Sequence, residues 1–294
     1  MNQDILAKYK KAGEIAIKAK ELARKRLNSE IKLLDLANEI ENFILQSGGK
    51  IAFPVNLSLN EEAAHSVPSW KDMRTYKPGD LIKVDVGVHI DGYIADTAFS
   101  FSTDEKDQDL IKASSEALRE MIKLATPGTE IRELGKKAYE IITSYGFKPI
   151  VNLTGHSLEQ YKLHAGISIP NYDTKENMKL EEGMAIAIEP FATNGVGLVI
   201  EGKEGEVMKL NRVIPVRNGR EIITWVKNER KELPFAKRWV LNKFNPLRSK
   251  LAMAELVRKG VFTQYNILRE KAKGRVSQTE HTVIVAEKPI VTTQ

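Results

Sequence analysis

The sequence predicts an α+β fold in which two similar helix-and-strand halves carry a small helical insertion. Helical periodicity covers residues 3–27 and 31–46 in the first half, and 106–124 and 129–145 in the second. An extended segment follows each pair, at 51–57 and at 149–153. The order helix, glycine, strand, Asn-Leu recurs at a shift of about 100 residues, which indicates a duplicated αβ unit, although any two αβ units share this outline.

The remaining strands bracket a long insertion. Residues 80–102 alternate as a hairpin with a turn signal at Asp91-Gly92, and apolar strands are expected at 184–191 and 279–286. Between these last two lie short helical segments at 222–231, 234–243 and 247–259. We therefore expect a main domain formed by 1–194 and 276–294, with 195–275 as a basic, mainly helical insertion subdomain of winged-helix type.

Composition restricts the chemistry and the location. The chain has 294 residues, 42% hydrophobic and 29% charged, and no apolar run of the length that a membrane span needs. Its first residues are polar and lack a signal-peptide core, so a cytoplasmic protein is expected. Because the chain contains no cysteine, any metal site must use His, Asp and Glu side chains.

Charge is spread unevenly along the chain. The formal net charge is +6, yet residues 201–275 alone contain 19 Lys or Arg against 8 Glu and no Asp. This segment is a candidate surface for ribosome or RNA association, because clustered cations attract phosphate backbones. A basic helical face is also common as plain solvated surface, so charge alone does not assign a partner.

Two acids of the predicted hairpin lie in apolar strands. Asp85 and Asp96 share one face of the sheet whether the turn is centred on residues 90–91, which makes them directly opposed, or on 91–92, which makes them diagonal neighbours. Unpaired carboxylates are costly to bury, and two so close repel each other unless cations lie between them. Two bridged divalent ions would remove the conflict. Alternatively, Lys83 on the same face neutralises one of them.

Three further residues extend this set. Glu189 ends an apolar strand, Glu280 begins another, and His156 follows a strand and a glycine, where an imidazole can face a cleft. Singly, each is more often an ordinary strand-end residue. Together with the two aspartates they form a group of oxygen and nitrogen donors, which is the ligand chemistry that a cysteine-free chain requires.

The local sequences around these residues resemble the pita-bread metallopeptidases of family M24, and within them the archaeal type II methionine aminopeptidases. The resemblance covers almost the whole chain, and 91 residues separate Glu189 from Glu280, which leaves room for the insertion that distinguishes type II from type I. It is carried by five motifs: AFPVNLSLNEEAAH, VDVGVHIDGYIADTAFSF, NLTGHSLEQYKLHAG, AIAIEPFATNG and TEHTVIV.

The resemblance implies a pita-bread fold and a role for each ligand. Asp85 would hold one metal, His156 and Glu189 would hold the other, and Asp96 and Glu280 would bridge both. The cofactor would be two divalent ions per chain, drawn from Co, Mn, Fe or Zn. Glu189 would also be the general base of a hydrolase that removes the initiator methionine from nascent chains, with preference for a small second residue.

The remaining histidines divide into two groups. His65 and His164 match the two substrate-contacting histidines of the family, and both are expected to be catalytic. Phe53 falls at the methionine-pocket phenylalanine, although a plain core position explains it nearly as well. His89 and His281 match no catalytic position and are expected to be structural.

Two other functions remain open at this point. One is a non-catalytic pita-bread protein that binds the ribosome or RNA. The other is an X-Pro peptidase, a prolidase or aminopeptidase P, which shares the five ligands but differs around the histidines. The motifs GHSLEQYKLHAG and IEPFATNG fit the methionine enzyme better. Membership of this family also implies a monomer.

Overall fold

The first half of the molecule packs two helices against a three-stranded antiparallel sheet. The structure is a computed structural model that describes residues 1–294. The sheet has the order β2-β5-β6, and a small pair, β1-β4, lies at its edge. The elements of this half are α1 Gln3–Arg26, β1 Ile31–Lys32, α2 Leu33–Gln46, β2 Lys50–Leu59, β3 Glu62–Ala64, β4 Thr75–Tyr76, β5 Ile82–Ile90 and β6 Tyr93–Phe101.

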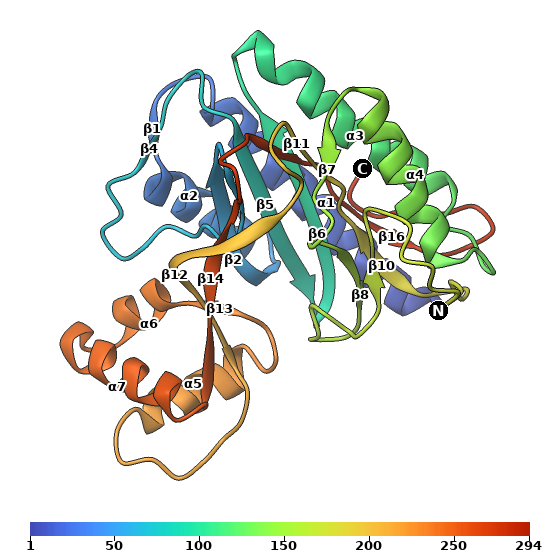
Figure 1. The fold of residues 1–294 in the computed structure, drawn as a ribbon. Helices are drawn as coiled ribbons and strands as arrows, with labels where there is room; N and C mark the ends of the chain where they lie inside the picture. The colour runs from blue at the N-terminus through green and yellow to red at the C-terminus, as the bar shows by residue number, and fades with distance from the viewer.

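The second half repeats the plan with its own helix pair. Its five-stranded sheet has the order β17-β16-β10-β8-β9, and α3 and α4 cover it (Figure 1). Three further strands of this half form a separate sheet in the order β15-β11-β7. The elements are η1 Glu105–Asp107, α3 Gln108–Lys123, α4 Ile131–Ser144, β7 Lys148–Pro149, β8 Gly155–Leu158, β9 Ser168–Ile169, β10 Ala185–Ile188, β11 Phe191–Thr193, β15 Val276–Gln278, β16 His281–Ile284 and β17 Ile290–Val291.

A smaller lobe, formed by residues 199–270, projects from the two halves (Figure 1). It has three helices at the predicted places, but three strands accompany them, so that it is a mixed rather than a mainly helical unit. The lobe buries its own apolar cluster, which includes Met208, Ile222 and Leu256. Its elements are β12 Val199–Leu210, α5 Arg220–Glu229, β13 Phe235–Ala236, α6 Lys237–Lys243, α7 Pro246–Arg258 and β14 Phe262–Glu270.

The helices and strands follow local signals in the chain. The side chain of Asn2 caps α1 by accepting from the Ile5 amide at 2.8 Å, and Gly48, with φ of +80°, follows the end of α2. Asp91 and Gly92 both have positive φ, which is the type I′ turn that the hairpin twist favours. None of the helices combines the length and the apolar character needed to cross a membrane.

Two local expectations were wrong. The extended segment predicted at 149–153 is limited to β7, because the chain turns at residues 151–152 immediately after Pro149. The helix predicted from residue 31 begins at Leu33, since residues 31–32 pair with β4 as a short strand. Both segments are apolar enough for either structure, and contacts with residues far away in the sequence decide between them.

The two halves meet along β6. Ala98 and Glu280 exchange backbone hydrogen bonds of 3.3 and 3.0 Å, and the Thr282 hydroxyl accepts from the Asp96 amide at 2.7 Å. Each half also buries its own apolar cluster behind its sheet. The face between the halves is therefore where side chains from β5, β6, β8, β10 and β16 come together.

A buried ion pair ties the small lobe to the first half. The guanidinium of Arg238, only 1% exposed, pairs with Glu41 of α2, whose other oxygen accepts from the Trp239 indole at 2.8 Å. We expect Glu41→Ala to lower the free energy of unfolding by about 3–5 kcal/mol, because it leaves a buried cation without its partner. Denaturant unfolding of the full chain measures this loss.

Glu39, two residues earlier on the same helix, is the matched control. It pairs with Arg26 at 3.0 Å where both side chains are exposed, so Glu39→Ala should cost only about 0–1 kcal/mol. Equal losses in the two variants would contradict the assignment of the Glu41 pair as the contact that secures the lobe.

Candidate metal centre

The β5–β6 hairpin places two aspartates on the face between the halves. Ile90 pairs with Tyr93, so the turn is Asp91-Gly92, and Asp85 and Asp96 are diagonal neighbours opposite Ala98 and Gly87. The parity argument is thereby confirmed, and the choice between its two turn registers is settled. Asp96 is 3% exposed, and its backbone is anchored to Thr282.

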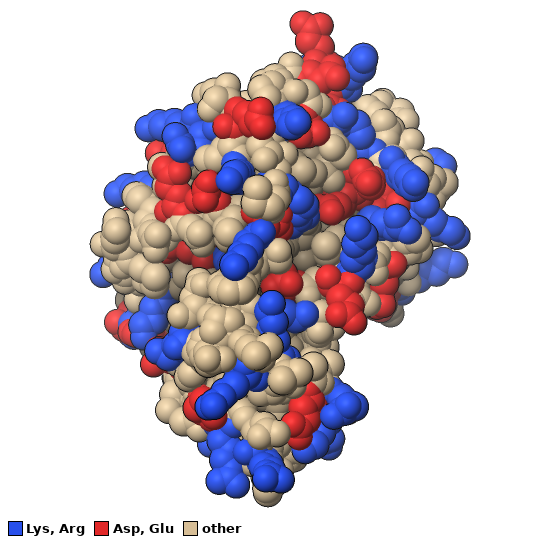
Figure 2. Space-filling model, turned by 90° about the vertical axis from the view of Figure 1, so that its left-hand side faces the viewer, with Lys and Arg blue, Asp and Glu red and all other residues tan.

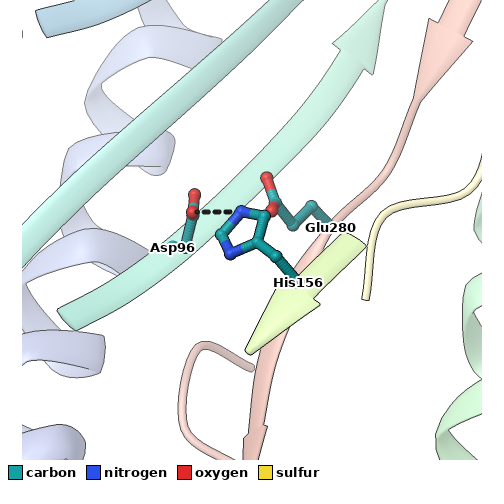
Figure 3. Close-up of side chains that lie close together, drawn as sticks. All are labelled: Asp96, His156 and Glu280. Carbon is teal, nitrogen blue, oxygen red and sulfur yellow. Dashed lines mark ion pairs between the residues drawn. The ribbon is translucent and has the colours of Figure 1, made fainter. Parts of the chain in front are cut away.

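Three residues from the second half meet this pair, and Figure 3 shows two of them, His156 and Glu280, beside Asp96. His156 lies on β8, Glu189 follows β10 and Glu280 precedes β16. The Nε2 atom of His156 lies 3.6 Å from an Asp96 oxygen and 3.8 Å from a Glu189 oxygen. Ligand atoms of Asp96, His156 and Glu280 lie within 4.8 Å of one another, and all three residues are buried. The group therefore has the spacing of a metal-ligand cluster.

No lysine or arginine forms an ion pair with these acids. Lys20, whose charge lowers the pKa of Glu280, donates from Nζ to the Thr97 hydroxyl at 2.6 Å instead. Lys83, the alternative partner, donates from Nζ to the Asn60 carbonyl at 2.8 Å and makes no ion pair with Asp85. One oxygen each of Asp85, Asp96 and Glu280 is buried without a hydrogen-bond partner. Buried polar atoms are almost always satisfied, so three orphaned carboxylate oxygens facing one cluster fit the coordination of hard or borderline divalent ions.

Burial and mutual repulsion shift the titration of the whole cluster. Burial raises the pKa of Asp85 to about 7. For Asp96, burial and then the Asp85 charge raise the pKa well above its ordinary value. Burial and neighbouring acids raise the pKa values of Glu189 and Glu280 in the same way, and burial lowers the pKa of His156 to about 3. A bound cation would relieve the repulsion among these carboxylates, and a neutral imidazole has a free lone pair for a metal ion.

Contacts that the sequence did not predict orient the acids. Gln278 donates from Nε2 to one Glu189 oxygen at 3.0 Å, which directs the other oxygen toward His156. The Thr97 hydroxyl donates to the Glu280 carbonyl at 2.7 Å. Gln278 lies two residues before Glu280, and a polar residue next to a predicted ligand is the only signal that would have singled it out.

The cluster forms the floor of a pocket of about 260 Å³. His65, His164 and Phe53 line it, together with all five predicted ligands. His65 adopts a left-handed conformation with φ of +61°, which is uncommon for a residue other than glycine and is found at functional sites. The ring of His164 lies edge-on to His156, with 4.3 Å between centroids. Sequence reasoning missed other lining residues, among them Phe191, Val207, Pro234, Tyr265 and Leu268.

The two histidines expected to be structural lie outside this pocket. The Nδ1 atom of His89 accepts from the Gly92 amide at 3.0 Å and so supports the hairpin turn. His281 lies 2.8 Å from the Thr293 hydroxyl through Nδ1, on the side of β16 away from the cluster. These contacts fit the structural roles expected for both residues.

The fold and the acid-lined pocket define the chain as a metallopeptidase, and comparisons with known proteins agree. Metallopeptidase family M24 matches residues 7–287, and the chain belongs to that family. Its relatives include methionine aminopeptidases of Pyrococcus abyssi, 48% identical over 96% of this chain and 97% of the relative, and of Thermococcus onnurineus, 49% identical over 94% of each. The activity is accordingly that of a methionine aminopeptidase, which removes N-terminal methionine.

Solved structures confirm the fold. The methionine aminopeptidase of Thermotoga maritima superposes with a TM-score of 0.72 at 21% identity, covering 100% of this chain and 98% of that one. A thermophilic Arx1 gives 0.85 at 18% identity, covering 99% and 91%. The prolidase of Pyrococcus furiosus gives 0.66 at 20% identity but is covered to only 64% of its length. At these identities the likeness shows the pita-bread fold alone, so the X-Pro alternative gains no support against the methionine aminopeptidase relatives.

The raised pKa of Asp85 predicts how the metal-free protein responds to pH. In the unfolded chain Asp85 loses its proton near pH 4, whereas in the folded chain it keeps the proton up to about pH 7. The contribution of Asp85 to the free energy of unfolding is therefore full below pH 4 and is lost as the pH rises through about 7. Between pH 5 and 8, in chelator, we expect the wild type to lose roughly 2–3 kcal/mol of stability relative to Asp85→Asn. Urea unfolding at the two pH values measures the difference.

Asp109→Asn supplies the control, since that aspartate is exposed on α3. Its unfolding should follow the wild type at both pH values. If the free energy of unfolding changes equally in the wild type and in Asp85→Asn between pH 5 and 8, Asp85 is not held in an environment that disfavours its charge.

Proposed function

We propose that the five clustered residues hold two divalent ions and that the chain uses them to remove the initiator methionine from nascent proteins. Asp85 would hold one ion, His156 and Glu189 the other, and Asp96 and Glu280 both. Orphaned carboxylate oxygens of Asp85 on β5, of Asp96 on β6 and of Glu280 just before β16 support this assignment. The ions would be Co, Mn, Fe or Zn, all of which accept oxygen and imidazole ligands. When bound, such ions make water nucleophilic near neutral pH and polarise the scissile carbonyl.

The protein groups around the ions have separate tasks in this proposal. Glu189 would take the proton of the attacking water and pass it to the leaving amine, and Gln278 keeps that carboxylate oriented. His65 and His164 would hydrogen-bond the scissile amide and the developing oxyanion. Burial lowers the pKa values of both histidines, so each is neutral at pH 7 and carries one ring N–H. In His65 that N–H is on Nδ1, which lies 3.3 Å from the Asn266 carbonyl, so Nε2 would accept from the scissile amide.

The pocket would select the substrate by shape. Phe53 would line the subsite for the methionine side chain, in a wall that also contains Leu163 and Pro234. An enclosed apolar subsite suits an unbranched thioether, and the limited space beside the cluster favours a small second residue. Phe53 is only 5% exposed, which agrees with this role and also with the plain core position.

Single substitutions separate metal binding from catalysis. We expect Asp96→Ala or Glu280→Ala to abolish both calorimetric metal binding and hydrolysis of Met-Ala-Ser, because each would remove a ligand shared by both ions. His65→Ala should keep the metal and lower kcat by about 10²-fold, because it removes one of the two histidines that hydrogen-bond the reacting groups. Asp91→Asn, in the turn of the same hairpin, is the control and should change neither. Unchanged activity in Asp96→Ala would end the proposal.

A second proposal concerns the small lobe. We propose that residues 195–275 form a separate insertion subdomain that brings the enzyme to the ribosome, in a cytoplasmic, monomeric protein. Lysine and arginine side chains gather at the lower end of the molecule in Figure 2. Arg217, just before α5, and Arg248, on α7, are both exposed and line one hollow of the lobe together with Glu221 and Glu255. Cations at the tip of a projecting lobe are well placed to meet phosphate groups.

Sedimentation with ribosomes tests this association. We expect binding at low salt that weakens steadily as salt rises, and that is reduced by the double substitution Arg217→Glu and Arg248→Glu. Hydrolysis of Met-Ala-Ser should stay unchanged in that variant. The control places the same charge changes at Lys10 and Lys136, which are exposed on α1 and α4. Equal loss of binding in both variants would show a general charge effect and contradict a specific role for the lobe.

A further inference from the structure

Strand β2 is irregular where it carries Phe53. Its pairing with β5 shifts register twice, between Ile51 and Phe53 and again between Phe53 and Asn56. Each shift adds a residue to β2 that has no partner on β5. Such bulges redirect side chains near functional sites, and they leave backbone groups without their ladder partners. The carbonyl groups of Ile51 and Ala52 therefore need donors from elsewhere in the molecule.

A single side chain of the small lobe provides those donors. The Nη1 atom of Arg230 donates to the Ile51 carbonyl at 2.7 Å, and its Nη2 atom donates to the Ala52 carbonyl at 2.8 Å. Arg230 follows α5 and is 7% exposed. Figure 1 shows the region of contact, where β13 of the lobe runs beside β2. The planar fork of a guanidinium suits two adjacent carbonyls in a way that a lysine ammonium does not.

The same guanidinium also holds a second segment of the pocket wall. Nε and Nη2 of Arg230 donate to the Pro234 carbonyl at 3.2 and 2.8 Å. Pro234 and Phe53 both line the pocket above the metal cluster. The ring of Trp239 lies 5.1 Å from the guanidinium and covers it. One buried cation thus spans two chain segments that are far apart in sequence but share the wall of one pocket.

Close packing on the other side fixes the Phe53 ring. A Cβ atom at Gly87 would lie 2.2 Å from the ring, so the ring rests directly on the backbone of β5. The Phe53 ring packs on Gly87, and Arg230 holds the two residues that precede Phe53 on β2. The ring therefore has little freedom to change its position. The position of the bulge therefore sets the dimensions of the subsite.

We propose that Arg230 is a positioning residue for methionine selectivity: it holds the β2 bulge and Pro234 in register, and so sets the shape of the subsite for the first side chain. This inference rests on the proposed function, specifically on Phe53 as part of that subsite. Arg230 touches neither the metal cluster nor the substrate. Its loss should therefore alter which side chain is accepted while the metal stays bound.

The test compares Met-Ala-Ser with Leu-Ala-Ser, whose first side chain is branched. In Arg230→Met we expect KM for Met-Ala-Ser to rise about tenfold with kcat changed less than threefold, and the Met-to-Leu ratio of kcat/KM to fall at least fivefold. Arg230→Lys keeps the charge and part of the hydrogen bonding, so it should be intermediate and should fold where Arg230→Met does not. Calorimetric metal binding should match the wild type in both.

Two controls separate this inference from the function on which it rests. Lys227→Met removes an exposed cation from α5, three residues before Arg230, and should leave the ratio unchanged. Phe53→Ala should lower the ratio if that residue lines the subsite. A lowered ratio in Phe53→Ala with an unchanged ratio in the folded Arg230 variants would overturn the role of Arg230 alone. An unchanged ratio in Phe53→Ala would overturn the subsite and the inference together.

Discussion

The constraint on which the molecule depends is the enclosure of four carboxylates in apolar β-structure, with Asp96 and Glu280 fully buried and Asp85 and Glu189 partly exposed to the pocket. Asp85, Asp96, Glu189 and Glu280 face one another without any lysine or arginine among them. A charge transferred from water into such surroundings without a partner is highly unfavourable, so four ionised carboxylates together would strongly destabilise the folded chain. Either protons or metal cations must compensate them, and only cations give the site a chemistry.

The architecture explains why the acids can be held so close together. Two come from one hairpin, where the alternation of side chains keeps them on the same face. The others come from the second half, whose strands meet β6 through direct backbone hydrogen bonds. Each half has its own apolar core, and these two cores hold the strands in place against the repulsion among the carboxylates. The small lobe adds a third support through Arg230 and Arg238, both buried at its junction with the first half.

Much of the site followed from the sequence because its determinants are local. The parity of Asp85 and Asp96 depends only on one hairpin, and an acid inside an apolar strand is visible without a structure. Position-by-position similarity to the family then indicated His65, His164 and Phe53, all of which line the pocket. The helices of both halves were predicted for the same reason, since periodicity and end signals lie within each segment.

The rest depends on contacts between distant residues. Nothing near Arg230 announces that its guanidinium reaches carbonyls about 180 residues earlier, and nothing in β2 marks its bulges. The Gln278 contact with Glu189 is likewise set by how two strands are placed. Residues 149–153 look extended in sequence but turn after Pro149, since tertiary packing overrides weak local preference. These are the features on which pocket shape and carboxylate orientation depend.

Calorimetric titration of the metal-free protein with Mn²⁺ or Co²⁺, in two buffers of different ionisation enthalpy, tests the central claim most directly. Carboxyls with raised pKa values hold protons until cations replace them, so binding must release protons. We predict saturation at two ions per chain with proton release at pH 7. A protein that binds no ion, or binds ions without releasing protons, would contradict the account.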